Sequence, residues 1–294
     1  MTVPPRPAFD PEGAAQRLFE RVACAARLDP SDRWVGGYAD YEWDHLRLAL
    51  RAYGVEAANR DVLEFGCNVG GSAVVLAALG ARVTGIDIDP ALVAIAGANL
   101  QRHRLAGAVR HVPAGQDLPL ADASFDLVIA NSVLEYVDPA RLDAVLAELH
   151  RLLRPGGRLF ICGTASRLAL RERHSGRWLV NYLPRAVDRL TGRVLQRGLS
   201  PWLLMRGLRG RFCEEGGGNW LAARRAIHGG VPIAGKIYAL LSKLTNCPPG
   251  LIAPYIELML RKSESGGAVG TIHRQSKRPE MRQFLRWLCS RLQW

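Results

Sequence analysis

The chain has 294 residues, of which 48% are hydrophobic and 22% charged. This composition is typical of a globular protein and excludes an intrinsically disordered one, and the length allows one large domain with an appendage. The net charge of +12 is uneven, because residues 1–150 carry 13 Lys and Arg against 20 Asp and Glu (−7), whereas residues 151–294 carry 26 against 7 (+19). The second half therefore favours an anionic partner.

Cysteine usage and hydropathy indicate where the protein works. Its six cysteines are scattered and form no CxxC pair, which argues against a zinc site and a disulfide framework. The N-terminal sequence MTVPPRPAFDPEG lacks the charged-then-apolar order of a signal peptide, and the longest apolar runs are about half of the ~20 residues that span a bilayer. We expect a cytoplasmic protein without a metal site, with peripheral contact to a membrane as an open alternative.

The first predicted unit is a strand, a turn, a helix and a second strand. An apolar run at residues 61–65 predicts a buried strand that enters a glycine-rich turn. Residues 72–79 suit a helix, and residues 81–87 predict the second strand. Asp89 is placed to cap the next helix, with Pro90 in its first turn.

The same alternation continues along the chain. Residues 107–112 and 124–130 predict a third and a fourth strand. A helix is predicted to start at Asp138-Pro139 and to end at the RPGG motif, and residues 158–163 predict a fifth strand. Strands that alternate with helices imply an α/β fold with a parallel sheet, and in such sheets ligands bind at the carboxyl ends of the strands.

The glycine-rich turn distinguishes between two kinds of ligand. A dinucleotide-binding turn has the pattern GxGxxG, whose second glycine lets a pyrophosphate approach the backbone closely. Here Gly66 and Gly71 match, but the second position is Asn68, whose side chain would crowd two phosphates. S-adenosylmethionine has no phosphate, so the turn favours this sulfonium ligand over a dinucleotide.

Four motifs follow one another along the chain: VLEFGCNVGG, VTGIDIDP, DLPLADASFDLVIANSVLEYV and ELHRLLRPGGRLFI. In their order and spacing they resemble those of the class I S-adenosylmethionine-dependent methyltransferases, and are most similar to the branch that methylates small molecules, lipids and quinones. The resemblance covers roughly residues 40–165. It implies a Rossmann-like, doubly wound, mostly parallel seven-stranded sheet with S-adenosylmethionine as the cofactor.

The resemblance also divides the chain into four parts. Residues 1–60 are expected to form a helical segment that covers the substrate, and residues 61–165 the cofactor-binding core. Residues 166–250 are expected to form a basic helical insertion after the fifth strand, where the family builds its substrate lid. Residues 251–294 would supply the last strand or strands and a C-terminal helix. In that helix four apolar residues have helical spacing, which suits docking on the domain itself or on a second chain: Met281, Phe284, Leu285 and Leu288.

Ten residues are assigned to the cofactor by the resemblance. The turn faces its methionine portion, Asp87 accepts hydrogen bonds from the ribose hydroxyls, and Ile88 packs on the adenine ring. The family often has an acidic residue before the LP pair; this chain has Ala114, so Gln116 or Asp117 would take over the adenine contact. The full set is Glu64, Gly66, Cys67, Asn68, Gly70, Asp87, Ile88, Gln116, Asp117 and Asn131.

Several of these residues also have a purely structural interpretation. Glu64 could cap backbone amides of the turn, and Asn131 could cap a loop without a part in catalysis. Cys67 lies inside the first motif but has no obvious base partner, so a reactive thiol is not expected.

Methyl transfer from a sulfonium needs alignment and exclusion of water, and a general base only where the acceptor must lose a proton. The candidates for a catalytic role are Asn131, Glu135, Tyr136 and His174, with His228 as a further possible base. Tyr136 stands where the family frequently has histidine, and a phenol with a pKa of ~10 is a poor base at neutral pH. A structural role is the simpler interpretation of any single histidine, so the sequence alone names no base.

Residues 166–250 mix Arg with Leu and Trp. Three interpretations remain open: a lid whose arginines are solvated, contact with an anionic membrane or a lipid-linked acceptor, and, least favoured, nucleic acid. We expect a methyltransferase that acts on a small, apolar or lipid-like acceptor, with oxygen favoured over carbon or nitrogen. The alternatives are a non-catalytic protein that binds the cofactor or a partner, and an RNA methyltransferase.

Overall fold

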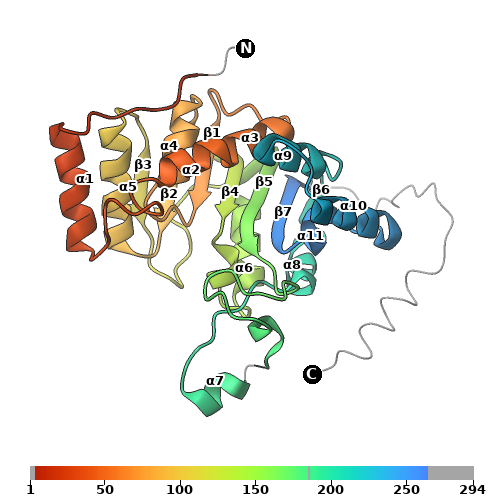
Figure 1. Cartoon of the computed structure of the whole chain (residues 1–294). Helices are drawn as coiled ribbons and strands as arrows, with labels where there is room; N and C mark the ends of the chain where they lie inside the picture. The colour runs from red at the N-terminus through yellow and green to blue at the C-terminus, as the bar shows by residue number, and fades with distance from the viewer. Residues whose placement is uncertain (1–3, 185, 264–294) are drawn as a thin grey trace.

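The computed structural model describes residues 4–184 and 186–263 (Figure 1). Its centre is a seven-stranded sheet in the order β3-β2-β1-β4-β5-β7-β6, in which β7 runs antiparallel to the other six strands. The predicted α/β fold with a mostly parallel sheet is confirmed. The strands are β1 (Asp61–Phe65), β2 (Arg82–Asp87), β3 (Ala108–His111), β4 (Phe125–Asn131), β5 (Leu153–Ala165), β6 (Phe212–Glu214) and β7 (Tyr255–Lys262).

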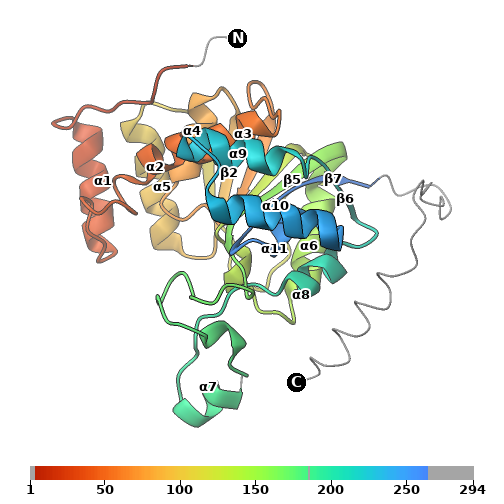
Figure 2. The ribbon, with the colours of Figure 1, turned by 45° about the vertical axis from the view of Figure 1, so that its right-hand side comes forward.

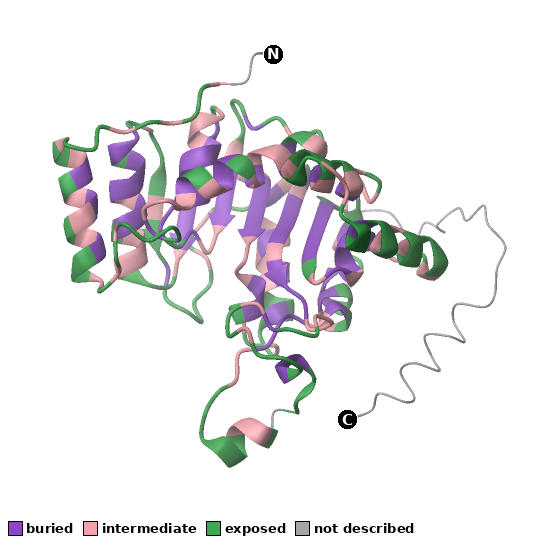
Figure 3. Cartoon of the chain, viewed as in Figure 1, coloured by how far each residue is buried: buried purple, intermediate pink, exposed green. Residues whose placement is uncertain are grey.

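Helices cover both faces of this sheet, so the fold is doubly wound (Figure 2). Alternate strand residues point to opposite faces: Val62 and Leu127 pack towards α3 (Leu46–Ala52), α4 (Gly71–Ala78) and α9 (Asn219–His228), whereas Leu63 and Val128 pack towards α6 (Leu142–Leu152) and α8 (Pro201–Leu208). Because both faces are covered, the central strands are buried along most of their length (Figure 3).

Short-range signals set the helix that follows β2. α5 (Pro90–Arg102) begins as predicted at Asp89, whose side chain accepts a hydrogen bond from the Ala91 N–H at 2.8 Å, with Pro90 in the first turn. α1 (Ala14–Ala25) packs on α5 through Phe19, which is fully buried.

The helix before β5 differs from the prediction at both ends. Asp138 closes a single turn, in which its carboxylate accepts from the Ala140 N–H at 2.9 Å, so α6 begins at Leu142 and not at Asp138-Pro139. The RPGG motif does not separate the helix from the strand. It lies inside β5, where Leu153 pairs with Phe125 before the register shifts, because Gly156 takes the positive φ of +71° that the irregularity requires.

The segment 166–250, predicted as a helical insertion, also supplies a strand to the core sheet. β6 is antiparallel to β7 and completes the sheet edge, because the register pairs Phe212 with Lys262. The helices of this segment are α7 (Ala186–Thr191), α8, α9, α10 (Ile233–Thr245) and α11 (Pro249–Ile252), and two views show the chain around α7 extending away from the sheet (Figures 1 and 2). The C-terminal helix predicted around Met281 lies outside the described residues.

Ion pairs join the strands at the amino ends of the sheet. Asp61 of β1 pairs with Arg82 of β2 at 2.7 Å and with Arg154 of β5 at 2.8 Å, and Arg154 reaches Asp126 of β4 at 2.7 Å. The hydrogen bond from Arg82, followed by the one from Arg154, lowers the pKa of Asp61 to about 2. The opposite, carboxyl ends of these strands are left to form the site.

Candidate active site

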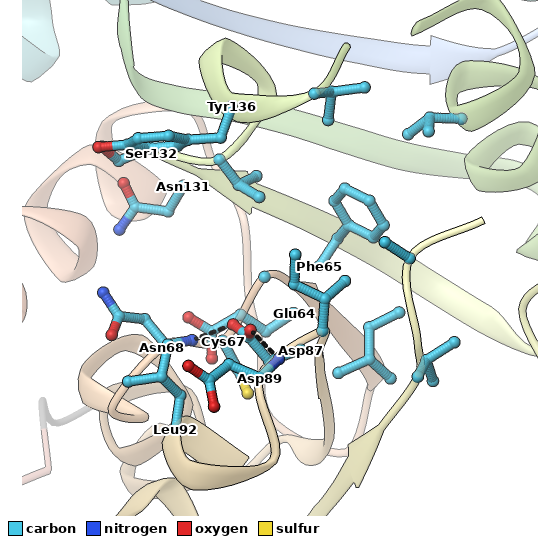
Figure 4. Close-up of a pocket in the computed structure, with 18 of the residues that line it drawn as sticks. Glu64, Phe65, Cys67, Asn68, Asp87, Asp89, Leu92, Asn131, Ser132 and Tyr136 are labelled. Atoms are coloured by element: carbon cyan, nitrogen blue, oxygen red, sulfur yellow. Dashed lines mark hydrogen bonds between the residues drawn. The ribbon is translucent and has the colours of Figure 1, made fainter. Parts of the chain in front are cut away.

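A cavity of about 960 Å³ opens at the carboxyl ends of β1, β2 and β4 (Figure 4). Its floor comes from the residues that follow these strands, among them Gly66, Asp87 and Asn131. Segments distant in the sequence close its sides: Trp34 and Tyr38 come from the N-terminal part, and His174 from the segment after β5. The volume suits a cofactor together with a small acceptor.

The turn after β1 requires glycine at two places. Gly66 has φ +75°, and a Cβ there would lie 2.3 Å from Val133 Cγ2. Gly70 has φ +79°, and a Cβ there would lie 2.9 Å from the Ala96 Cα. L residues rarely adopt this conformation and neither neighbour leaves room, so the turn holds its shape only with these glycines.

Asn68 occupies the position of the second glycine in the GxG pattern without breaking the turn. Its φ is +49°, in the left-handed region that asparagine tolerates better than most residues. Its backbone N–H donates to Asp87 Oδ2 at 2.8 Å, which ties the turn to the end of β2. The departure from the family pattern therefore keeps the backbone geometry and changes the side chain that lines the cavity (Figure 4).

Asp87 ends β2 with its carboxylate fixed from two sides. Oδ1 accepts from the Asp89 N–H at 3.1 Å and Oδ2 accepts from the Asn68 N–H. Each oxygen keeps capacity for a second hydrogen bond, as the predicted contacts with two ribose hydroxyls would need. The neighbouring Ile88 lines the cavity and is 64% exposed, so an aromatic ring resting on it would cover apolar surface.

Glu64 is a buried carboxylate that lines the same cavity. Burial raises its pKa well above the ordinary value, against the opposing hydrogen bond from the Ser72 hydroxyl. Among the described residues its Oε2 atom has no hydrogen-bond partner. An unpaired buried carboxylate oxygen suits a cationic ligand, and S-adenosylmethionine carries both an ammonium and a sulfonium group. The residues present therefore fit this cofactor.

The raised pKa of Glu64 predicts that cofactor binding releases a proton. The free protein holds this carboxyl protonated over a wider pH range than an ordinary glutamate, and a cation beside it favours the ionised form. Calorimetric titration in two buffers of different ionisation enthalpy should give different apparent binding enthalpies, and Glu64→Gln should abolish the difference. Equal enthalpies for the unmodified protein would contradict the prediction.

Asn131 is occupied with structural hydrogen bonds. Its Nδ2 group donates to Glu42 Oε1 at 2.9 Å and to Ser72 Oγ at 3.1 Å. Both amide hydrogens are therefore used to hold the cavity floor to α2 (Tyr38–Asp44) and α4, which favours the structural interpretation of Asn131 over a catalytic one. Glu42 and its hydrogen-bond donor Tyr38 were not predicted, although their i, i+4 spacing places them on one helical face.

His174 stands at the wall of the cavity between two of the other predicted catalytic candidates. Its Nε2 lies 3.4 Å from Glu135 Oε1, and its Nδ1 lies 3.0 Å from the Tyr136 hydroxyl. The Glu135 side chain is fully buried behind the histidine and also accepts from the Ala165 N–H at 3.1 Å. Tyr136 and His174 line the cavity, whereas Glu135 does not. The three form an imidazole with a buried carboxylate behind it and a phenol beside it.

The backbone that carries His174 is held by a second buried carboxylate. Glu172 accepts from the His174 N–H at 3.0 Å and from the Ser175 N–H at 2.6 Å. Burial alone would raise the pKa of Glu172, but these backbone hydrogen bonds outweigh it and hold the pKa below its usual value. Arg173 donates to the Gly163 carbonyl at 2.6 Å, so the residue before the histidine is anchored to β5.

Some of the remaining predicted residues line the cavity and others lie outside it. Gln116 and Ala114 line the cavity, but Asp117 is not among its lining residues. Cys67 lines it as well, and burial, followed by the charges of nearby carboxylates, raises the pKa of this thiol, in agreement with an unreactive cysteine. His228 lies in the last turn of α9, outside the cavity.

Two further observations concern the described residues alone. Within residues 4–184 and 186–263, no cluster of three or more His, Cys, Asp or Glu side chains is arranged to hold a metal ion. In the same part of the chain, no helix combines the length and the apolar character that crossing a membrane requires.

A family model described as a methyltransferase domain matches residues 63–161. The demethylmenaquinone methyltransferase of Tropheryma whipplei (strain Twist) is 33% identical over 147 residues, which cover 50% of this chain and 57% of the relative. The ubiquinone biosynthesis O-methyltransferase of Maricaulis maris is 30% identical over 197 residues, which cover 63% of this chain and 74% of the relative. Among solved structures, the PH0226 protein of Pyrococcus horikoshii is 20% identical with a TM-score of 0.49, over 65% of this chain and 90% of that one.

The match to the M. maris relative extends well beyond the motifs, and the site agrees with it. The turn, the carboxylate at the end of β2 and the unpaired Glu64 oxygen all fit S-adenosylmethionine as the cofactor. The chain belongs to the family of S-adenosylmethionine-dependent methyltransferases.

Proposed function

We propose that the protein transfers a methyl group to a hydroxyl oxygen of a small, apolar, lipid-like acceptor, with His174 as the general base. One observation carries this proposal: a histidine at the cavity wall has a buried carboxylate 3.4 Å behind it. A carboxylate in that position orients an imidazole and stabilises the cation that forms when the imidazole takes a proton.

The proposed reaction is an in-line displacement. S-adenosylmethionine supplies an electrophilic methyl group on a sulfonium, and the thioether that leaves is neutral, so no acid is needed. An oxygen–carbon bond forms, the sulfur–carbon bond breaks, and the hydroxyl proton passes to His174. The protein must therefore align the hydroxyl, exclude water and accept one proton.

The positions around His174 favour one tautomer. Because Nε2 lies 3.4 Å from Glu135 Oε1, a hydrogen on Nε2 would face this carboxylate, which leaves the Nδ1 lone pair to accept the proton. The Tyr136 hydroxyl lies 3.0 Å from Nδ1 and 3.2 Å from Nε2 and does not select between the tautomers. Burial, followed by the charges of Glu135 and Glu172, raises the pKa of Tyr136 to about 12. The phenol therefore stays protonated at neutral pH and does not act as a base.

Apolar side chains on the cavity wall support an apolar acceptor. Five apolar side chains line the cavity together with Tyr136: Phe65, Leu118, Val133, Val137 and Val145. The names of the two curated relatives refer to menaquinone and ubiquinone, which supports a phenolic or quinol-like acceptor for this chain.

The test is methyl transfer from S-adenosylmethionine labelled on its methyl group. The acceptors are a phenolic quinol and the matched compound whose hydroxyl is already methylated, together with a bacterial extract separated into organic, aqueous and RNA fractions. Label on the free hydroxyl alone supports the proposal. Label on carbon or nitrogen overturns the choice of oxygen, and label in RNA overturns the acceptor class. Cofactor binding without label in any fraction contradicts catalysis and favours the non-catalytic alternative.

A further inference from the structure

In the described part of the chain, helix α10 turns its apolar face towards solvent and not towards the core. Five apolar residues of α10 follow the spacing i, i+4, i+7, i+8 and i+11, which places them on one helical face. All of them are exposed, from 40% for Leu241 to 78% for Ile233. We name this face the α10 stripe: Ile233, Ile237, Leu240, Leu241 and Leu244.

The opposite side of α10 explains why the stripe faces outwards. Gly235 is the buried residue of this helix, and a Cβ there would lie 3.2 Å from Val231 Cγ1 and 3.9 Å from the Trp220 ring. The helix thus contacts the protein through Tyr238, which packs on the core, and through its glycine, which brings its backbone close to α9. The colouring by burial shows α10 mostly exposed at the edge of the molecule (Figure 3).

Charge distinguishes between the possible occupants of the α10 stripe. Lys236 and Lys243 flank it on one side, and no Asp or Glu occurs from residue 216 to residue 256. Two copies of this surface would bring like charges together, whereas an anionic surface would neutralise them. Residues 166–250 as a whole carry 15 Lys and Arg against 4 Asp and Glu, a balance of +11.

A groove connects α10 with the loop that carries His174. This groove is a second cavity, of about 680 Å³, and is lined by Tyr238 of α10 together with Trp178 and Tyr255. Trp178 is 68% exposed, and tryptophan is the residue that most favours the boundary between lipid and water. Arg173 lines both this groove and the cavity of the active site, so the two are neighbours.

We propose that the α10 stripe lies in the interface of an anionic phospholipid membrane, with Lys236 and Lys243 at the level of the phosphates and Trp178 at the rim. A helix with apolar side chains on one face and lysines beside them binds such an interface in its plane. The proposal concerns a binding surface and holds whether or not the chain methylates a lipid-like acceptor.

The full chain would be sedimented with vesicles of phosphatidylcholine, with or without about one third phosphatidylglycerol. We expect binding to the anionic vesicles, weakened by salt, and little binding to the neutral ones. Ile237→Ser with Leu240→Ser and Leu244→Ser should weaken binding roughly tenfold or more, since three apolar side chains no longer leave water. Lys236→Gln with Lys243→Gln should weaken binding to anionic vesicles about tenfold, since each lysine near the surface contributes.

The control removes apolar side chains elsewhere that are even more exposed than those of the α10 stripe. Leu190 and Val194 are 85% and 92% exposed near α7, and Leu190→Ser with Val194→Ser should keep the binding. An equal loss in this control would overturn the assignment to α10. Absence of binding to the anionic vesicles would overturn the proposal as a whole. A dimer that the α10 variant converts to a monomer, without vesicle binding, would assign the stripe to a second copy. Methyl transfer in solution is measured separately, so failure of one proposal leaves the other testable.

Discussion

His174→Ala is expected to lower kcat for methyl transfer to a hydroxyl acceptor by about 10²–10⁴-fold, the usual contribution of a general base. We propose His174 as the base because it lines the cavity and its Nε2 lies 3.4 Å from Glu135 Oε1. The affinity for S-adenosylmethionine should not change, since the cofactor turn lies on other strands. Steady-state kinetics with a calorimetric titration measures both quantities.

The matched control for this prediction is His228→Ala, which removes a histidine that lies outside the cavity and should keep kcat. Glu135→Gln should lower kcat by less than His174→Ala, because Glu135 positions the imidazole and does not reach the cavity itself. Its effect should fall on kcat more than on KM. A pH–rate profile that is identical in the unmodified protein and in His174→Ala would remove His174 from the proton transfer.

Asp87→Ala is expected to weaken the binding of S-adenosylmethionine by about 1–3 kcal/mol, through loss of charge-assisted hydrogen bonds. The same carboxylate accepts from the Asn68 and Asp89 N–H groups, so its removal also loosens the turn. A calorimetric titration measures the change, and the thermal unfolding midpoint shows whether the variant is folded.

The sequence offers a close control for Asp87→Ala. Asp117 was predicted as a cofactor contact, yet it is not among the residues that line the cavity, so Asp117→Ala should bind the cofactor with unchanged affinity. If Asp87→Ala bound S-adenosylmethionine as tightly as the unmodified protein does, Asp87 would not be a cofactor contact. A loss in Asp117→Ala as large as that in Asp87→Ala would restore Asp117 to the adenine pocket.

Local sequence was least informative where one residue can serve two structural purposes. The RPGG motif was predicted to end a helix, but the same glycine that allows a turn also allows a bulge within β5. Asp138 was predicted to start α6, but a short side chain that accepts from nearby amides can close a single turn equally well. For the RPGG motif, pairing with β4 selects the outcome, because it fixes where β5 begins.

The sequence by itself determined the alternation of strands and helices from β1 to β5, the cofactor turn and the carboxylate at the end of β2. These features depend on contacts between near neighbours and on a regular alternation of apolar residues, which the chain carries locally. The tertiary structure decided what the sequence left open. It brought His174 beside Tyr136, 38 residues earlier, and placed the fully buried Glu135 behind it. It also turned the apolar face of α10 outwards by packing Gly235 near Trp220. Such arrangements depend on how the crossovers of the sheet place distant segments, and no local pattern encodes that placement.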